Sequence, residues 1–393
     1  MQFGDIFSWI FWLLLLFVLS FFGPRLMLSQ YLIKIEGAVN VLERRSIKGK
    51  NFVLKRISKS PDFELIRRVS SFLDFFVIEP VSLDPSGIVE KLEHVLNLSD
   101  ERIKSFVREI APKLDSEEQM NLCMGLSAAI SLHQLAKIMK HYLELIKKTK
   151  NLQLALLIQM QLPLIDRISK ALVSGTEALT NGWPIGDSIG PLIVGGLIGN
   201  SKCIEKNETV ICRKKIKGKD VILIKAKGPG GRVGKIGRVV EEILKKERVS
   251  KIITIDAAVK LEGERTGSIA EGIGVAIGGI GVDRAFIERV AVKKKIPLES
   301  IVIKMSNEEA IQPMKKEILN AEKKVVNAIE EILKRSKGKI MIVGVGNTCG
   351  IGNSKREVED AKKKIEKIIK IVKRRKRIEK EKRKWSLSRL FEI

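Results

Sequence analysis

The sequence predicts a C-terminal α/β domain with a mostly parallel sheet and helices on both faces, preceded by one transmembrane helix and an all-α region. Three patterns predict this: an uncharged apolar run near the N-terminus, apolar residues at three- and four-residue steps through the first half, and alternating strands and helices after Gly182. These patterns divide the chain into an anchor (1–26), a helical domain (27–181), an α/β domain (182–353) and a basic C-terminal helix or tail (354–393).

The predicted anchor runs from Ile6 to Phe22 within a stretch that has no charge between Asp5 and Arg25. At ~1.5 Å per residue this stretch spans close to the ~30 Å hydrocarbon core of a bilayer. A cleaved signal peptide would need a basic start and a small-residue cleavage site, and neither is present. Basic residues follow the run and none precedes it, so we expect a single-pass protein of the cell membrane with its N-terminus outside and its body cytoplasmic.

The helical domain shows one long apolar stripe from Leu122 to Ile146, which indicates a helix packed along one side. A second apolar run, from Leu152 to Leu164, is too short for another span and contains Gln and Pro. We therefore expect it to form a buried core helix. No motif in this region indicates chemistry.

The α/β domain follows from strands that alternate with helices, a pattern typical of parallel pairing. We expect strands or hairpins at 203–219, 221–226, 251–257, 300–305 and 339–346, helices at 234–248, 283–295 and 308–335, and a strand or short helix at 191–199. The glycine-rich stretch that ends at Gly281 is expected to be an irregular loop.

Composition limits the class of protein. With 72 Lys and Arg against 46 Asp and Glu the net charge is +26, while aromatic residues make up only 5%, which argues against a single-strand binder that stacks bases. Abundant Lys, Ile and Glu are typical of a thermophile. The four scattered cysteines fit a reducing compartment, although Cys203 and Cys212 would approach one another in a hairpin, and the sequence leaves their pairing open.

The first candidate site is the glycine turn between a predicted strand and a predicted helix. Backbone N–H groups at such a turn bind phosphate or carboxylate, and basic side chains would add charge. Asp256 ends the next strand, 22 residues beyond Gly234, near the offset of a ribose-binding acid. An empty tight turn is the structural alternative. The expected ligand-binding residues here are Gly228, Gly230, Gly231, Arg232, Gly234 and Lys235.

The second candidate site is a group of carboxylates around the glycine-rich stretch between Gly263 and Gly281, which contains seven glycines. Parallel α/β sheets place active sites at the carboxyl ends of their strands, and Asp256 lies at the end of a predicted strand. Carboxylates grouped there could act as acid and base or bind a divalent cation. The candidates are Asp256, Glu262, Glu264 and Asp283 for catalysis and Glu271 for ligand binding; exposed side chains on a solvated loop are the alternative.

A second glycine turn, from Gly344 to Asn353, also follows a predicted strand and precedes a predicted helix. We expect Gly344, Gly346 and Asn347 to bind ligand at the same edge of the sheet. Asp187 lies between glycines at the entry to the domain, either at this edge or in a linker. These residues do not decide whether the cofactor is a nucleotide or a divalent metal.

The C-terminal segment from Ser354 carries 17 Lys and Arg against 7 Asp and Glu. Its apolar stripe, Ala361 to Val372, predicts a helix that starts packed and ends solvated. The basic end could bind anionic lipid or nucleic acid, and Trp385, Leu387, Leu390 and Phe391 favour a membrane surface. A solvated basic helix is the alternative.

With the anchor, PIGDSIGP, GPGGRVGK and IDAAVKLEGERTGSIAEGIGVAIGG all present, the chain resembles an archaeal family of single-span membrane proteins called domain of unknown function 1512. The resemblance covers nearly the full length and implies no established activity.

The α/β domain alone also resembles hydrogenase-maturation endopeptidases and germination proteases, through IDA at Asp256 and VGVGN at Asn347. In those proteins the GVGN strand comes first and a metal-binding acid follows, whereas here it comes last and Thr348 follows. A histidine ligand is also absent from this domain. The resemblance therefore implies a role for Asp256 only.

Three functions follow as expectations. The first is a membrane-anchored, cytoplasmic-facing protein that binds a small anionic ligand, a nucleotide or phosphorylated compound, at the glycine-rich edge. The second is a hydrolase or peptidase that uses Asp256 and neighbouring carboxylates. The third is a tethered interaction protein that binds anionic lipid or nucleic acid through its basic tail. The oligomeric state is open.

Overall fold

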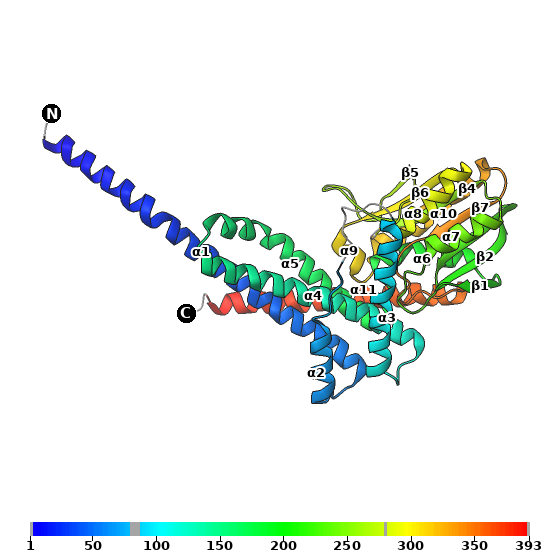
Figure 1. Ribbon diagram of the computed structural model, residues 1–393, viewed down its shortest axis with the longest axis horizontal. Helices are drawn as coiled ribbons and strands as arrows, with labels where there is room; N and C mark the ends of the chain where they lie inside the picture. Colours follow the sequence, from blue (N-terminus) through cyan, green and yellow to red (C-terminus); the bar gives the residue numbers. More distant parts are fainter. Residues whose placement is uncertain (1–2, 79–86, 279–280, 391–393) are drawn as a thin grey trace.

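A computed structural model describes residues 3–78, 87–278 and 281–390. A long helix projects alone from the N-terminus, and two further long helices then lie beside it and lead to an α/β domain at the other end of an elongated molecule (Figure 1). The helical region contains α1 (Phe3–Ile57), α2 (Phe63–Phe72), α3 (Ile88–Ile110), α4 (Ser116–Thr149) and α5 (Leu152–Thr180).

The long helices α1, α4 and α5 bury a shared apolar core, in which Ile35 and Leu42 meet Met139, Ile146 and Ala155. The α4 helix starts at a capping box, because Asp115 accepts the Glu118 N–H at 2.8 Å and the Glu118 carboxylate accepts the Asp115 N–H. Of the predicted stripe on this helix, Leu122, Leu126, Ala129, Leu132 and Ile146 are buried, whereas Ile138 is 52% exposed.

The apolar N-terminal run does not form a separate helix, since α1 continues without a break from the run into the helical core. Most side chains from Trp9 to Phe17 are exposed, with Trp9 at 70%. Within the described residues, α1 and α4 are both long and apolar enough to cross a membrane, and half of the α4 window is buried in the protein. Length and composition alone make each a weak candidate.

The second apolar run, at the start of α5, packs on one side only. Ala155 is buried in the core, while Leu157 and Met160 are 60% and 68% exposed on the opposite side. The expectation of a buried core helix at 152–164 therefore holds for one side of the helix only.

The described part of the α/β domain has one sheet with the strand order β1-β2-β3-β7-β4-β6-β5. The strands are β1 (Cys203–Lys206), β2 (Thr209–Ile216), β3 (Lys219–Ala226), β4 (Lys251–Val259), β5 (Ile269–Ile273), β6 (Leu298–Met305) and β7 (Ile340–Gly344). The central strands β3, β7, β4 and β6 pair in parallel. The pairs β1–β2, β2–β3 and β5–β6 are antiparallel.

The sheet is therefore mixed, and the expectation of a mostly parallel sheet is wrong. Two features cause the difference. The polar segment after Cys203 folds into a meander that extends the sheet by antiparallel strands. The glycine-rich stretch predicted as an irregular loop contains β5, whose short strand turns back along β6.

Helices cover both faces of the sheet, as expected. One face packs against α7 (Ile236–Lys246) and α8 (Val282–Lys294), and the other against α6 (Ile189–Ile198), α10 (Lys316–Arg335) and α11 (Lys355–Leu390). The helix predicted over 308–335 is two helices, α9 (Asn307–Ile311) and α10. Pro313 lies in the break, where it has no N–H to continue a helix.

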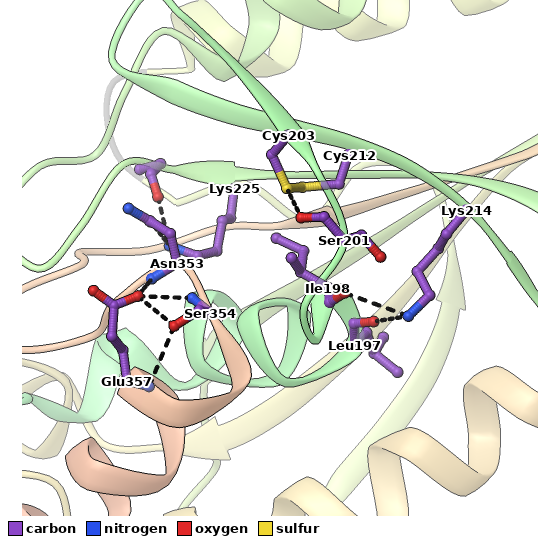
Figure 2. Close-up of a disulfide and its surroundings, with 11 residues drawn as sticks. Leu197, Ile198, Ser201, Cys203, Cys212, Lys214, Lys225, Asn353, Ser354 and Glu357 are labelled. Atoms are coloured by element: carbon purple, nitrogen blue, oxygen red, sulfur yellow. Dashed lines mark hydrogen bonds between the residues drawn. A yellow bond between two sulfur atoms is a disulfide. The ribbon is translucent and has the colours of Figure 1, made fainter.

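A disulfide joins Cys203 and Cys212, which face one another across the β1–β2 hairpin (Figure 2). The structure thus forms the pairing that the sequence leaves open, while Cys123 and Cys349 are free and buried. Nearby, Lys225 is fully buried and donates to Asn353 Oδ1 at 2.8 Å and to the Ala226 carbonyl at 2.9 Å. Burial lowers the pKa of Lys225 to about 7, although Glu357 acts against this change.

The C-terminal helix α11 starts packed on the sheet layer, with Ala361, Ile365 and Ile368 buried. Further along, Arg375 donates to Glu177 of α5 at 2.7 Å. The helix then continues to Leu390, as the sequence predicts for a packed start and a basic end. Phe391 lies outside the described residues.

Candidate active site

A cavity of about 380 Å³ lies where β4 and β7 end, between α7, α8 and the helix α3 of the helical region. The carboxyl ends of parallel strands are where α/β sheets usually bind ligands. Its walls contain three aspartates, three glycines and seven apolar residues. These are Asp187, Asp256 and Asp283; Gly278, Gly281 and Gly346; and Leu96, Val233, Ile236, Ala257, Ile277, Val282 and Val345.

Asp256 lies on β4, where alternate side chains face opposite sides of the sheet. Ile253 and Ile255 face α6 and α10, so Asp256 faces α7 and α8. Its Oδ1 accepts the Ala257 N–H at 2.7 Å, and its Oδ2 accepts the Gly278 N–H at 2.9 Å. The glycine-rich segment thus folds over the sheet to hold this carboxylate, which is 3% exposed.

Asp187 lies in a short 3-10 turn, η1 (Gly186–Ser188), just before α6. Its Oδ2 accepts the Asn347 N–H at 2.7 Å. Gly346 has φ +124°, and a Cβ there would lie 2.0 Å from the Asp187 carbonyl oxygen. Only glycine allows this close approach. Of the two sequence interpretations for Asp187, the structure supports a position at the sheet edge.

Asp283 lies in the first turn of α8, and its Oδ1 accepts the Gly237 N–H at 2.6 Å. Gly237 is in the first turn of α7, where backbone N–H groups have no partner within the helix. The carboxylate therefore ties the starts of two helices together at the cavity wall.

Burial makes all three carboxyl groups harder to ionise. Burial and then the charge of Asp187 raise the pKa of Asp256 to about 7, against the effect of the Gly278 and Ala257 N–H groups. Burial also raises the pKa of Asp187, against the Asn347 N–H, and the pKa of Asp283, against the Gly237 N–H. Among the described residues, none of the three forms a salt bridge, so no cationic side chain offsets these increases in pKa.

In the glycine turn after β3, Val233 lines the cavity, whereas Gly230 and Arg232 lie against the start of α4. Glu117 accepts the Gly230 N–H at 2.6 Å and both Nη atoms of Arg232, at 2.5 and 3.0 Å. Arg232 is 9% exposed. The Thr348 hydroxyl holds the same turn by donating to the Gly230 carbonyl at 2.8 Å.

The other residues of this turn determine the conformation of its backbone. Gly228 leaves no room for a Cβ against the Ile351 carbonyl, and Gly234 has φ +67°. Lys235 caps the start of α7 through the backbone. Of the six expected ligand-binding residues in this turn, none lines the cavity.

Some of the remaining predicted site residues lie at the cavity and others lie outside it. Glu264 pairs with Lys304, Glu271 lies 3.6 Å from Arg335, and Glu262 is exposed, so these three lie outside the cavity. Gly344 packs against Gly190, whereas Gly346 and the Asn347 backbone support Asp187. The structure thus brings Asp256, Asp283 and Gly346 together from the predicted set.

Sequence reasoning missed Leu96, which comes from α3 and has no local signal of a site. Within 3–78, 87–278 and 281–390, no group of three or more His, Cys, Asp or Glu side chains is arranged to hold a metal ion.

Comparison with known proteins shows a family but no activity. No curated protein matches this chain. A family model described as the N-terminal domain of a protein of unknown function (DUF1512) matches residues 9–182, and one described as the C-terminal domain of DUF1512 matches residues 185–352. These matches confirm the family resemblance predicted from the sequence and cover most of the chain. The chain therefore belongs to the DUF1512 family.

Proposed function

We propose that this chain is a membrane-anchored hydrolase of peptide amides in which Asp187 and Asp256 form a catalytic pair. The observation that carries the proposal is a cavity at the strand ends lined by Asp187 and Asp256, in which burial and then the Asp187 charge raise the pKa of Asp256 to about 7. Two carboxyl groups that share a proton can act as acid and base on the same substrate.

The proposed reaction needs only water and an amide. The ionised carboxylate takes a proton as the water oxygen bonds to the carbonyl carbon, and the protonated carboxyl group gives its proton to the carbonyl oxygen. In the second step a diol hydroxyl returns a proton to the pair, the C–N bond breaks, and the amine nitrogen takes a proton from the pair. The products are a carboxylic acid and an amine, and the pair again holds one proton.

The expected small anionic ligand is less well supported. A phosphate in this cavity would meet three carboxylates, and no Lys or Arg lines its walls among the described residues. The backbone N–H and guanidinium groups predicted to bind the anion already contact Glu117. This function and the binding of lipid or nucleic acid by the tail stay predictions.

The test uses the full chain in detergent with a library of unstructured peptides, and mass spectrometry detects cleavage. We expect cleavage by the native chain and its loss in Asp256→Asn and Asp187→Asn. Asp220→Asn, an exposed aspartate on β3, is the matched control and should cleave normally. Cleavage that survives in Asp256→Asn, or a native chain that cleaves nothing, would refute the proposal.

We also propose that α1 anchors the chain in the cell membrane with the N-terminus outside and the body cytoplasmic. The support is an 18-residue apolar window of α1 that no other part of the chain buries, followed by Arg25, Lys34 and Arg44. A single cysteine placed at exposed Lys137 should be protected from a membrane-impermeant maleimide in intact cells. Labelling without permeabilisation would reverse the orientation.

A further inference from the structure

The helix α3 belongs to the helical region, yet Leu96 on this helix forms part of the cavity wall. Glu93, Leu96, Asp100 and Lys104 follow one another at three- and four-residue steps, which places them along one side of α3. This side meets the α/β domain, so both domains build the cavity.

Ion pairs hold α3 in this position. Glu93 accepts from Arg238 Nε at 2.8 Å, Glu90 accepts from Arg289 at 2.9 Å, and Lys104 donates to Glu208 at 2.8 Å. The Arg238 guanidinium also lies 4.1 Å from the centre of the Phe286 ring. Contacts on both sides of Leu96 therefore fix where its side chain lies.

The wall around the aspartates is apolar. Besides Leu96 it contains Val233, Ile236, Ile277, Val282 and Val345. A volume of about 380 Å³ is at the low end of the range for ligand pockets, ~300–1,000 Å³. That space suits one amide and one adjoining side chain.

The charge of an entering side chain decides whether it can stay there. A carboxylate would lose its water and meet three aspartates. An ammonium group would lose its water in a pocket whose walls are mostly apolar, and the backbone N–H groups bound to each aspartate leave fewer carboxylate lone pairs to replace that water. An aliphatic side chain gains from burial in the same space.

From this arrangement we infer that the cavity is a specificity pocket for one aliphatic side chain of an extended peptide, and that Leu96 sets its depth. This inference rests on the proposed function, since it names the substrate side chain for the same site. Leu96 is a specificity-determining residue and takes no part in the proton transfers.

The test measures binding as well as cleavage. Acetylated and amidated hexapeptides, identical except for one central residue, are labelled and titrated by fluorescence polarisation against the full chain carrying Asp256→Asn. We expect central Leu, Ile or Met to bind at least tenfold tighter than Glu or Lys. Leu96→Ala should shift the preference to Phe, and Leu96→Phe should shift it to Ala or Val.

Leu98→Ala is the matched control, because Leu98 lies on the same helix, is 59% exposed and does not line the cavity. Thermal melting of each variant shows whether it folds. The inference is overturned by binding that prefers Lys or Glu, by a preference that Leu96→Ala and Leu98→Ala change equally, or by no binding of any peptide. If the native chain cleaves nothing while Leu96 still controls binding, only the proposed hydrolysis fails.

Discussion

Glu117 of α4 occupies the position in which the sequence predicts an anion, and its replacement by alanine tests that interpretation directly. The Glu117 carboxylate accepts the Gly230 N–H and the Arg232 guanidinium, so it joins the helical region to the glycine turn of the α/β domain. In Glu117→Ala these donors lose their acceptor. The guanidinium of Arg232 stays buried, since it is held at 9% exposure by its surroundings.

The expected loss of stability is large for one side chain. Removing one partner of a buried ion pair costs ~3–5 kcal/mol, because the other charge is left uncompensated. For a domain of this size ~1 kcal/mol corresponds to ~2–4 °C, so the melting midpoint should fall by roughly 6–20 °C. Glu64→Ala is the matched control. It removes a bidentate partner of Arg67, at 2.9 and 2.8 Å, where both side chains are more than half exposed, and should leave the midpoint nearly unchanged.

Differential scanning fluorimetry of the full chain in detergent measures both variants, with and without inorganic phosphate. Phosphate should raise the midpoint of Glu117→Ala, because the freed donors can bind it, and should leave the native chain unchanged. Equal midpoints for Glu117→Ala and Glu64→Ala would refute the assignment of this contact as a buried joint. A phosphate effect of equal size on the native chain would refute the idea that Glu117 fills the anion position.

Three further predictions follow. Because burial and Asp187 raise the pKa of Asp256 from 3.8 to about 7, the contribution of Asp256 to stability is complete below about pH 4 and is lost as pH rises through 7. The change in the free energy of unfolding is about 4 kcal/mol and is measurable as a falling melting midpoint. Cleavage should also decline above about pH 7, and a flat pH profile would contradict the assignment. Peptide mapping without reductant should recover Cys203 linked to Cys212, and recovery of both as free thiols would disprove the pairing. Removal of residues 377–393 should leave the melting midpoint unchanged and weaken binding to anionic vesicles. Removal of residues 355–393 should unfold the domain, since it deletes buried Ile365. Vesicle binding that the shorter deletion leaves unchanged would exclude a lipid role for the tail.

The order of helices and strands in the α/β domain could be predicted because β4, β6 and β7 are apolar runs that alternate with longer helical segments. Strand β5 could not, since its five residues include Gly272 and have no apolar alternation. Its antiparallel pairing depends on β6, a neighbour 25 or more residues away in sequence. Short strands of this kind are decided by tertiary contacts.

The candidate site was predictable in part for a similar reason. Asp256 follows the apolar run of β4 directly, and that local pattern is enough to mark it. Asp187 and Leu96 reach the cavity only through the packing of α6 and α3, which no local pattern encodes. The glycine turn misled the sequence interpretation, because the chain's own Glu117 satisfies the donors that resemble an anion site.

The length of α4 also determines how far the cavity stands from a bilayer. Its 34 residues extend ~50 Å, from the Glu117 contact with the α/β domain to the end that packs beside Leu28, just after the apolar part of α1 (Figure 1). With α1 anchored as proposed, lipids and the membrane-buried segments of neighbouring proteins cannot reach the cavity. A polypeptide leaving the bilayer surface would need about 15 extended residues to arrive at Asp256. Under the proposed function, the substrates that reach the cavity would therefore be long tails or soluble chains that approach from the aqueous side.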